Sequence, residues 1–466
     1  MVSRIVLLGM MIQSVGFAAD GSEPAADTPP AVEYGSGVSY WGPIPAPADS
    51  ISAVFRNTPR PAWEYPLLVP YRVAEAPIRL TWNIAGASYS FLQEQNVLST
   101  IGRLLGPRDL PYGFMVNFKA GGITGIGGGL TFYHDAFFGE ANRFKVRTLY
   151  TTTGTRRAVL GLLVGKDRAT YLDSGAGYTL RQNARFFGLG PRSRSENLSY
   201  FSQETSWIGG TLGHHEGPFL GELTAVYSGA GTHKPNAERT PTLPEVFRRQ
   251  PFGYGELSKV TTVSVALSHE TVDGDGRPDR GGIRRVETSF TMPSGTSPGG
   301  DYWGFRGDLE QFLPLWFTER ALAFRGYIGY FAASTTKIPF QRLYTNDEPD
   351  QLRGFDDYRW RDRGIVNATL EYRWPAWALN TLQGTGVDAY LLSDVGQVFH
   401  TRQQIDRRNV TVSYGGGLRI VTGTGFQGRI EIAHSKEETV FRIASDQLFQ
   451  YNKGDLYNGR DQGILR

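Results

Sequence analysis

One segment of the sequence combines residue types that bind metal ions. Asp273, Asp275 and Asp279 lie in the segment DGDGRPD, where carboxylates alternate with glycine as they do in calcium loops. The distal glutamate and the remaining ligands of such a loop are missing, so we interpret the segment as an Asp/Gly turn. The segment 213–217, GHHEG, offers zinc-binding side chains, but no further histidine follows at the ligand spacing of a helix. We interpret it as a turn too, and the sequence predicts neither a metal site nor a cofactor.

Covalent catalysis would need a nucleophile and a base that converge on one rim or face of the protein. The seven histidines are scattered along the chain and accompany no nucleophile motif, and only His400 has a carboxylate, Asp394, near it in sequence. The absence of cysteine excludes disulfides, thiolate metal sites and a cysteine nucleophile. The sequence therefore predicts that the protein is not an enzyme, and a membrane-anchored hydrolase is left as an alternative.

The tetrad Leu352, Arg353, Gly354 and Phe355 lies in a connection of nearly thirty residues. Strands of alternating polarity are predicted on both sides of this connection. An arginine followed by glycine and an aromatic residue in such a position favours a loop that folds inward. The alternative, on pattern alone, is a solvated arginine on a surface loop.

The composition points to a single repetitive all-β architecture. The 466 residues include 58 glycines, 23 tyrosines, 27 phenylalanines and 9 tryptophans, an excess of glycine and aromatic residues. The net charge of +3 is too small to drive binding to nucleic acid, and no basic tail accompanies it. Nucleic acid is therefore excluded as a partner.

The beginning of the chain resembles a secretory signal. Arg4 precedes the apolar run IVLLGMMI, and small residues follow, so we predict a signal peptide over 1–18 with cleavage after Ala18. The apolar run is shorter than the ~20 residues that a membrane-spanning helix needs. Many of the 26 prolines fall in 19–79, and 19–111 is interpreted as an extended periplasmic segment with a possible amphipathic helix at 91–105.

Strict alternation marks the strands toward the C-terminus. In 366–374 the apolar residues are Val366, Ala368, Leu370, Tyr372 and Trp374, and polar or charged residues occupy the other face. A soluble sandwich has the same period, since one face of each sheet is buried. The charges on the polar face and the aromatics near strand ends favour a barrel with its apolar face toward lipid and its polar face toward water.

The sequence predicts an antiparallel transmembrane β-barrel of about sixteen strands over 112–449. The candidate strands are 112–119, 122–134, 142–152, 155–165, 177–187, 199–213, 217–228, 258–270, 282–292, 300–314, 320–334, 363–374, 384–398, 410–421, 424–434 and 438–449. An even number suits a closed barrel with both termini on one side. Connections after even-numbered strands are short, whereas 229–257 and 334–362, after odd-numbered strands, are long.

Four separated patterns resemble the outer membrane protein 85 superfamily, and within it the bacterial surface antigen barrels of the BamA/TamA type. The tetrad 352–355 is similar to the Val-Arg-Gly-Phe/Tyr motif of that family's sixth extracellular loop, with Leu for Val. LLSDVGQVF at 391–399 and NATLEYRWP at 367–375 resemble two of its barrel-wall strands. FFGLG at 186–190 adds a weaker match. The turn at 273–282 resembles its Asp-rich periplasmic turn, through Asp273, Pro278, Arg280 and Gly281.

The resemblance implies that Arg353 folds into the lumen and pairs with Glu371 and Asp394 of the wall. Physical chemistry supports such a pairing, because a guanidinium held away from water needs carboxylates that accept its fork of donors. Two departures stand against the resemblance. The segment 19–111 contains no convincing copy of the family's periplasmic POTRA domains, and the chain continues over 450–466 past Phe449, which fits the terminal-strand aromatic.

The function that the resemblance implies is outer-membrane biogenesis, in which the barrel helps polypeptide, or lipid, to insert or cross. Its partners would be outer-membrane lipid, client polypeptides and a periplasmic or lipoprotein partner, and its seam would lie between the first and last strands. One alternative is a passive or gated solute channel whose selectivity is set by lumen charges such as Arg373, Arg419, Arg429 and Glu431. Another is a surface antigen or adhesin that presents the loop at 229–257.

Overall fold

The computed structural model describes residues 111–444, apart from 122–124, 167, 236–240, 273–277, 316–319, 334–336, 347–351, 381–384 and 423–424. The predicted signal peptide, the proline-rich segment with its helix, and the C-terminal extension lie outside the described residues. The same holds for Asp273, Asp275 and Phe449.

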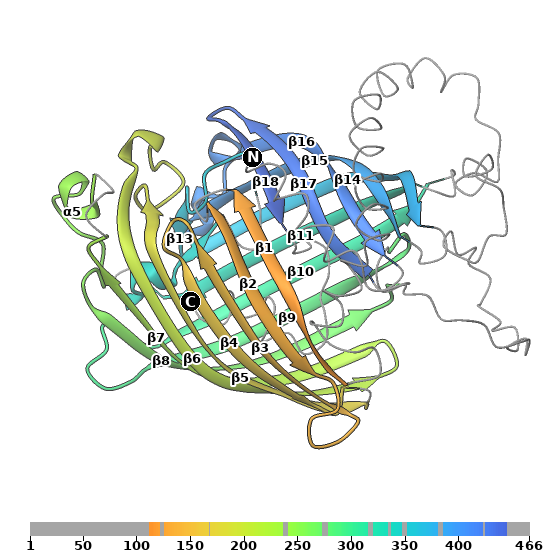
Figure 1. Cartoon of the computed structure of the whole chain (residues 1–466). Coiled ribbons are helices and arrows are strands. Elements are labelled where there is room, and N and C mark those ends of the chain that lie inside the picture. Colours follow the sequence, from red (N-terminus) through yellow and green to blue (C-terminus); the bar gives the residue numbers. More distant parts are fainter. Residues whose placement is uncertain are drawn as a thin grey trace, which may run out of the picture.

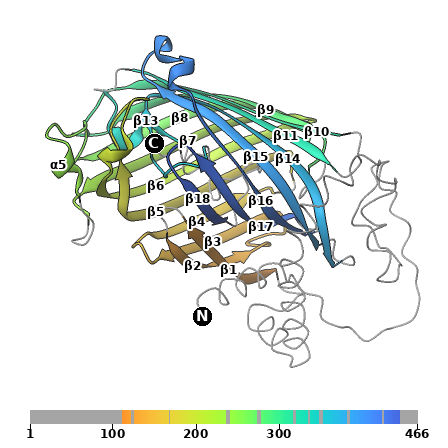
Figure 2. The same ribbon diagram turned by 90° about the horizontal axis from the view of Figure 1, so that it is seen from above.

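Sixteen antiparallel strands form one closed barrel, which confirms the predicted architecture (Figures 1 and 2). The first eleven strands are β1 (Tyr112–Gly121), β2 (Ile126–His134), β3 (Asn142–Thr151), β4 (Arg156–Val164), β5 (Thr170–Phe186), β6 (Ser199–Glu216), β7 (Phe219–His233), β8 (Leu257–Glu270), β9 (Gly281–Pro293), β10 (Tyr302–Pro314) and β11 (Ala321–Ala332). The last five are β14 (Gly364–Asn380), β15 (Thr385–Phe399), β16 (Thr411–Thr422), β17 (Gly425–Ser435) and β18 (Thr439–Ala444). Each strand pairs with its neighbour in sequence, and β11 pairs with β14.

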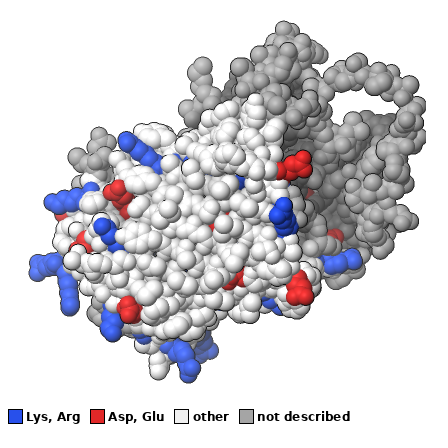
Figure 3. Space-filling model, turned by 90° about the horizontal axis from the view of Figure 1, so that it is seen from below, with Lys and Arg blue, Asp and Glu red and all other residues white. Residues whose placement is uncertain are grey.

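The barrel wall is apolar outside and polar inside. On β14, the apolar residues predicted to face lipid are partly or fully exposed, whereas Asn367, Thr369, Glu371 and Arg373 are buried on the lumen side. The space-filling view shows a broad, largely uncharged band across the wall, with basic side chains gathered at one end (Figure 3). A water-soluble sandwich would bury the apolar face instead, so the wall is built to face hydrocarbon.

The two ends of the barrel carry different connections. The end reached after odd-numbered strands, here called the loop end, carries the long segments 234–256 and 333–363, the first of which contains α5 (Leu243–Val246). The opposite turn end carries short connections such as Gly217–Pro218 between β6 and β7. Within the described part of the chain, no helix is long and apolar enough to span a membrane.

Several strands extend beyond their predicted bounds. β7 continues to His233 and β14 to Asn380, past the predicted ends at 228 and 374. β5 begins at Thr170 and not at 177, and it pairs with β4 in unbroken register from Leu172, with Gly175 opposite Gly161. β6 continues to Glu216, so the interpretation of 213–217 as a turn was wrong. The reversal takes only Gly217, at φ 57°, and Pro218, which leaves both histidines in the ladder.

Among the described residues, the barrel closes through a short seam. In this part of the chain, β1 pairs with β18 at two positions, Ala120 with Ile443 and Gly121 with Arg442. In contrast, β1 pairs with β2 continuously from Tyr112 to Ala120. Figure 1 shows β1 and β18 as neighbours at this junction. The seam is therefore the least extensively paired junction among the described strands.

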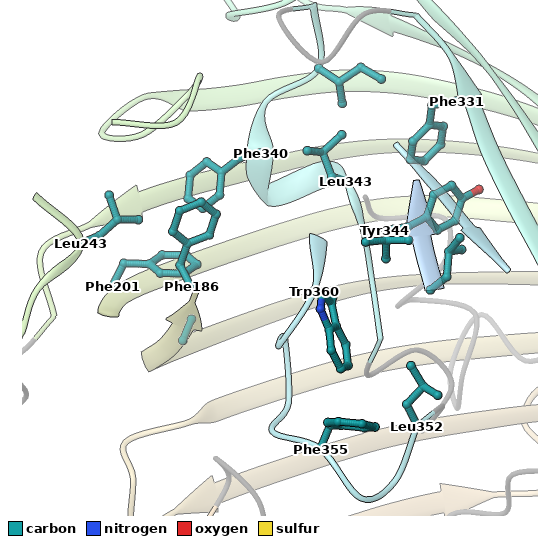
Figure 4. Packing of buried hydrophobic residues seen from close by; sticks show 14 of the residues in the cluster. Phe186, Phe201, Leu243, Phe331, Phe340, Leu343, Tyr344, Leu352, Phe355 and Trp360 are labelled. Atoms are coloured by element: carbon teal, nitrogen blue, oxygen red, sulfur yellow. The ribbon is translucent and has the colours of Figure 1, made fainter. Parts of the chain in front are cut away.

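Residues 333–363, here called the lumen loop, fill the lumen at the loop end. They contain the 3-10 helix η5 (Phe340–Arg342) and the small hairpin of β12 (Tyr344–Thr345) and β13 (Arg361–Asp362). Their apolar side chains pack against wall residues in one buried cluster (Figure 4). Members from the loop are Ile338, Phe340, Leu343, Tyr344, Leu352, Phe355 and Trp360, and members from the wall include Phe186, Phe201, Tyr302 and Phe331. This packing turns a long connection into a small folded plug.

Candidate functional site: an arginine cage in the barrel lumen

The predicted tetrad occupies a tight turn inside the lumen. Leu352 adopts φ 60°, which is rare for a residue with a branched side chain, and the Phe355 amide donates to the Leu352 carbonyl at 3.1 Å. The turn directs the Arg353 side chain into the barrel wall, where it is 0% exposed. The inward-folded loop is therefore observed, and the alternative of a solvated surface arginine is excluded.

Asp394 on β15 is the main partner of Arg353. The guanidinium donates from Nε to Oδ2 at 3.0 Å and from Nη2 to Oδ1 at 2.7 Å, and the Arg353 backbone amide reaches Oδ2 at 3.1 Å. Thr369 and Ser413 donate their hydroxyls to the same carboxylate at 3.0 and 3.2 Å. Asp394 thus receives a bidentate fork and three further hydrogen bonds, which compensate for its burial.

Glu371 on β14 binds the other side of the guanidinium. Arg353 Nη1 donates to Glu371 Oε1 at 2.6 Å. The second oxygen, Oε2, accepts from Arg373 Nε at 2.9 Å and Nη2 at 2.7 Å. The structure therefore places Arg353 between the two acids that the family resemblance implies.

A third acid, Glu431 on β17, completes the cage, and the sequence analysis did not assign it to the cage. Its Oε2 lies 3.4 Å from Arg353 Nη1 and 3.4 Å from Arg429 Nη1, and accepts from the Tyr390 hydroxyl at 2.8 Å. Strand alternation had placed Glu431 on the polar face, but it gave no information on which wall residues surround the loop. Strand alternation would have identified Glu431 as a member of the cage only in combination with the barrel register.

The cage balances its charges. Arg353, Arg373 and Arg429 face Asp394, Glu371 and Glu431 in a water-poor interior. Burial lowers the pKa of the Arg353 guanidinium, but Asp394, Glu371 and Glu431 raise it more, so the net pKa lies well above its usual value. Arg353 is therefore a permanent cation, and removing it would leave acids uncompensated at a typical cost of about 3 to 5 kcal/mol.

Gly354 and Phe355 hold the arginine in place. A Cβ on Gly354 would lie 2.7 Å from the Ser413 Cβ and 2.8 Å from the His434 carbonyl carbon, so only glycine lets the turn approach β16 and β17 this closely. Phe355 is fully buried and packs edge-on against Trp360 with ring centroids 4.7 Å apart (Figure 4). The three residues of the motif thus provide charge, close approach and an apolar anchor.

Ion pairs at the loop end tie the lumen loop to strands on both sides of the seam. Arg442 of β18 donates to Asp357 Oδ1 at 2.7 Å, and Arg359 binds Glu437, on the turn between β17 and β18, at 2.7 and 3.1 Å. Arg185 of β5 pairs with Asp356. These contacts bind the loop to β5 as well as to β18, although the two strands lie several positions apart in the sheet.

Arg342 anchors the far side of the lumen loop through two serines of the wall. Its guanidinium donates to the Ser258 hydroxyl at 2.8 Å, the Ser258 carbonyl at 2.7 Å and the Ser228 hydroxyl and carbonyl at 3.1 and 3.2 Å. Burial lowers the pKa of this arginine. No pattern in the sequence marks this contact, because serines on β7 and β8 are ordinary lumen residues.

The remaining predicted residues lie elsewhere. Pro278, Arg280 and Gly281 are at the turn end, between β8 and β9, where Gly281 adopts φ 82° close to the Thr271 carbonyl. His400 Nδ1 lies 3.4 Å from Asp362 Oδ1, and Asp394, its neighbour in sequence, binds Arg353. Across the described ranges no group of three or more His, Asp or Glu side chains could hold a metal ion.

FFGLG contacts the lumen loop directly. The Gly190 amide donates to the Arg361 carbonyl at 2.9 Å, and the Arg359 guanidinium lies over the Phe187 ring at 5.2 Å. Three of the four main resembling segments and this weaker one therefore meet around a single loop.

A protein-family model described as the Omp85 superfamily domain matches residues 136–437. The chain belongs to the Omp85 superfamily. No curated protein sequence matches the chain. Among solved structures, the Omp85 barrel is similar to BamA from Haemophilus ducreyi lacking POTRA domains 1–3, at 16% identity and a TM-score of 0.52, over 72% of this chain and 70% of that one. CdiB from Escherichia coli matches at 13% identity and a TM-score of 0.49, over 73% of this chain and 63% of that one.

Family membership gives the location of this Omp85 barrel. It belongs in the bacterial outer membrane. The lumen loop is the sixth connection at the loop end, and the cage holds it inside the barrel.

Proposed function

We propose that this Omp85 barrel assists the insertion or translocation of polypeptide in the outer membrane. The observation that carries the proposal is the short seam. Ala120 and Gly121 of β1 pair with β18, whereas the described remainder of β1 pairs only with β2. Unpaired backbone N–H and C=O groups of an edge strand can template a further strand, and this is how a client segment would engage the barrel.

Because the lumen is plugged, we favour a route for the client through the barrel wall over a route through the pore. The lumen loop packs a buried apolar cluster across the loop end, and three separate ion-pair contacts fix its tip. A client strand paired with β1 would leave through the parted seam without displacing this plug. A lipid could take the same lateral path.

In this function the cage would hold the lumen loop in position, and no residue would perform covalent chemistry. Arg353 holds the loop against β14, β15 and β17. β17 lies next to β18, and β15 and β14 lie two and three strands beyond β17. These strands would stay fixed while β18 moves. Client polypeptides, and a periplasmic or lipoprotein partner that delivers them, complete the proposed cycle.

A reversible seam lock tests the proposal. Ala120 and Ile443 face each other across the seam, at a separation that suits a disulfide, and the chain has no cysteine of its own. The variant Ala120→Cys/Ile443→Cys is reconstituted in liposomes, and the folding of an unfolded outer-membrane barrel is followed by its heat-modifiable gel migration. We expect the native protein to accelerate folding, oxidation of the pair to abolish the acceleration, and reduction to restore it.

A matched pair on fully paired strands provides the control. Leu223→Cys/Val265→Cys joins β7 to β8, whose register is continuous, so its oxidation should leave the acceleration intact. Acceleration that persists with the seam locked would refute lateral insertion. A steady, solute-selective conductance of the native protein, without any effect on client folding, would favour a channel.

A further inference from the structure

The connection between β15 and β16 is a built structure at the loop end. Figure 2 shows it standing out from the barrel wall at the end of these strands. Two 3-10 helices, η6 (Arg402–Gln404) and η7 (Arg407–Asn409), form it. The Asn409 side chain donates to the Gln404 carbonyl at 2.9 Å, and the His400 amide donates to the Gln404 side chain at 2.7 Å. The loop therefore presents its side chains from a fixed scaffold.

Three arginines on this loop are exposed and form no ion pair with any described residue. They are Arg402, Arg407 and Arg408. The single acid of the loop, Asp406, accepts from the Arg408 backbone amide at 3.0 Å and so caps η7. Guanidinium groups without a carboxylate partner are a common means by which proteins bind phosphate, because the fork of donors matches its oxygens.

The loop also exposes an aliphatic side chain among the arginines. Ile405 lies between the two 3-10 helices and is 45% exposed. Exposure of an isoleucine side chain to water is unfavourable. Its transfer to the boundary between lipid headgroups and acyl chains is favourable. Three arginines around an exposed apolar residue are typical of a protein surface that contacts lipid headgroups.

The position of the loop brings it to headgroup level. β16 begins one residue after it, and the outward-facing Val412 and Tyr414 on that strand are 50% and 58% exposed. These side chains belong to the apolar outer wall, so the loop emerges where the hydrocarbon belt ends. Exposed Lys436 on the nearby turn between β17 and β18 adds a further positive charge at the same rim.

We propose that the β15–β16 loop binds the phosphate groups of outer-leaflet lipid, with Arg402, Arg407 and Arg408 as the ligands and Ile405 as the apolar contact. The partner is the phosphorylated headgroup of a glycolipid of the lipid A type, held in the membrane. This interaction goes beyond the insertion activity, since it concerns how the barrel sits in the bilayer beside β15 and β16.

A single fluorescent label tests the proposal in intact protein. Because the chain has no cysteine, Ile405→Cys carries one polarity-sensitive dye. The labelled barrel is placed in bilayer discs of phosphatidylcholine, with or without lipid A, and the dye emission is recorded against the lipid A fraction. We expect a blue shift that saturates with lipid A and is absent in phosphatidylcholine alone.

Charge variants assign the shift to the loop. In the labelled background, Arg402→Gln/Arg407→Gln/Arg408→Gln should require about a hundredfold more lipid A at low salt, since each basic side chain near an anionic surface contributes about a factor of five. The control Arg194→Gln/Arg248→Gln/Arg249→Gln removes three exposed arginines from other loops of the same rim and should leave the titration unchanged.

Three outcomes would overturn the proposal. The first is an equal emission with and without lipid A. The second is an equal loss in both triple variants, which would show a general charge effect of the rim. The third is the same shift caused by inorganic phosphate in phosphatidylcholine discs, which would assign the arginines to a soluble anion.

Discussion

Arg442 on the last barrel strand donates to Asp357 of the lumen loop at 2.7 Å and also reaches the Phe355 carbonyl at 3.4 Å. The same residue pairs with Gly121 at the seam. β18 is therefore held both by its two pairs with β1 and by the loop that the cage fixes in the lumen. Movement of the seam and the position of the loop are therefore physically linked through the Arg442 side chain.

Removing this link should loosen the seam. For Arg442→Gln we expect amide hydrogen exchange in β1 and β18 to accelerate about tenfold, because a hydrogen bond to a charged group contributes roughly 1.5 kcal/mol or more. Hydrogen exchange resolved by mass spectrometry measures the effect, and amides of β6 and β7 in the same sample are the internal reference. Unchanged exchange in β18 would show that the loop does not restrain the seam.

Removing the central cation should destabilise the whole plug. Arg353→Ala leaves Asp394 and Glu371 without their shared partner, so we expect a loss of about 3 to 5 kcal/mol in unfolding free energy and a raised background conductance. Arg353→Lys keeps the charge but lacks the fork, so it should recover only part of the loss.

Urea unfolding followed by gel mobility measures the Arg353 variants, and Arg248→Ala, on an exposed loop, is the control with an expected change within about 0.5 kcal/mol. If Arg353→Ala unfolds at the same urea concentration as the native barrel, the cage does not stabilise the fold.

A single methyl group should displace the motif turn. Gly354→Ala places a Cβ 2.7 Å from Ser413 and 2.8 Å from the His434 backbone, and neither neighbour is the free end of a flexible side chain. We expect a markedly lower yield of folded barrel. Gly221→Ala on β7 is the matched control, since its Cβ would meet only Leu267 at 3.8 Å. Equal yields for the two variants would contradict the close approach of the turn.

The turn between β17 and β18 should make stability depend on pH. Burial, followed by the nearby Asp356 charge, raises the pKa of Glu438 from 4.5 to about 7, against the lowering effect of Arg185. Between these values the folded protein binds the proton more tightly than the unfolded chain. The contribution of Glu438 to stability is therefore complete below pH 4.5 and is lost as the pH rises through 7.

Glu438→Gln should remove this dependence. We expect the variant to melt at a higher temperature than the native barrel at pH 8, and the difference to shrink toward pH 5. Thermal unfolding by circular dichroism at both values measures it, with Glu256→Gln on an exposed loop as the control. A difference that grows toward acid pH would reverse the sign assigned to Glu438.

The sequence predicted the wall of the barrel well, because wall geometry is periodic. Lipid outside and water inside impose a period of two on every strand, and Val412, Tyr414 and Arg419 fall on the predicted faces. Boundaries failed where local residues mislead, as at Gly175, which lies before the predicted start of the strand at 177 but is paired within β5. Glycine in a ladder cannot be distinguished from glycine in a turn without knowledge of the neighbouring strand.

The residue types of the cage were present in the sequence, but their arrangement was not. Alternation alone placed Glu371 and Glu431 on the lumen side, and the motif resemblance named Arg353, Glu371 and Asp394. Glu431, Arg342 and the Arg442–Asp357 pair needed coordinates, since they join residues between 78 and 114 positions apart or lie on loops without periodicity. Strand register is a local, repeating property. The path of a long loop depends instead on which distant side chains compensate its buried charges. Only the closed barrel brings these side chains together.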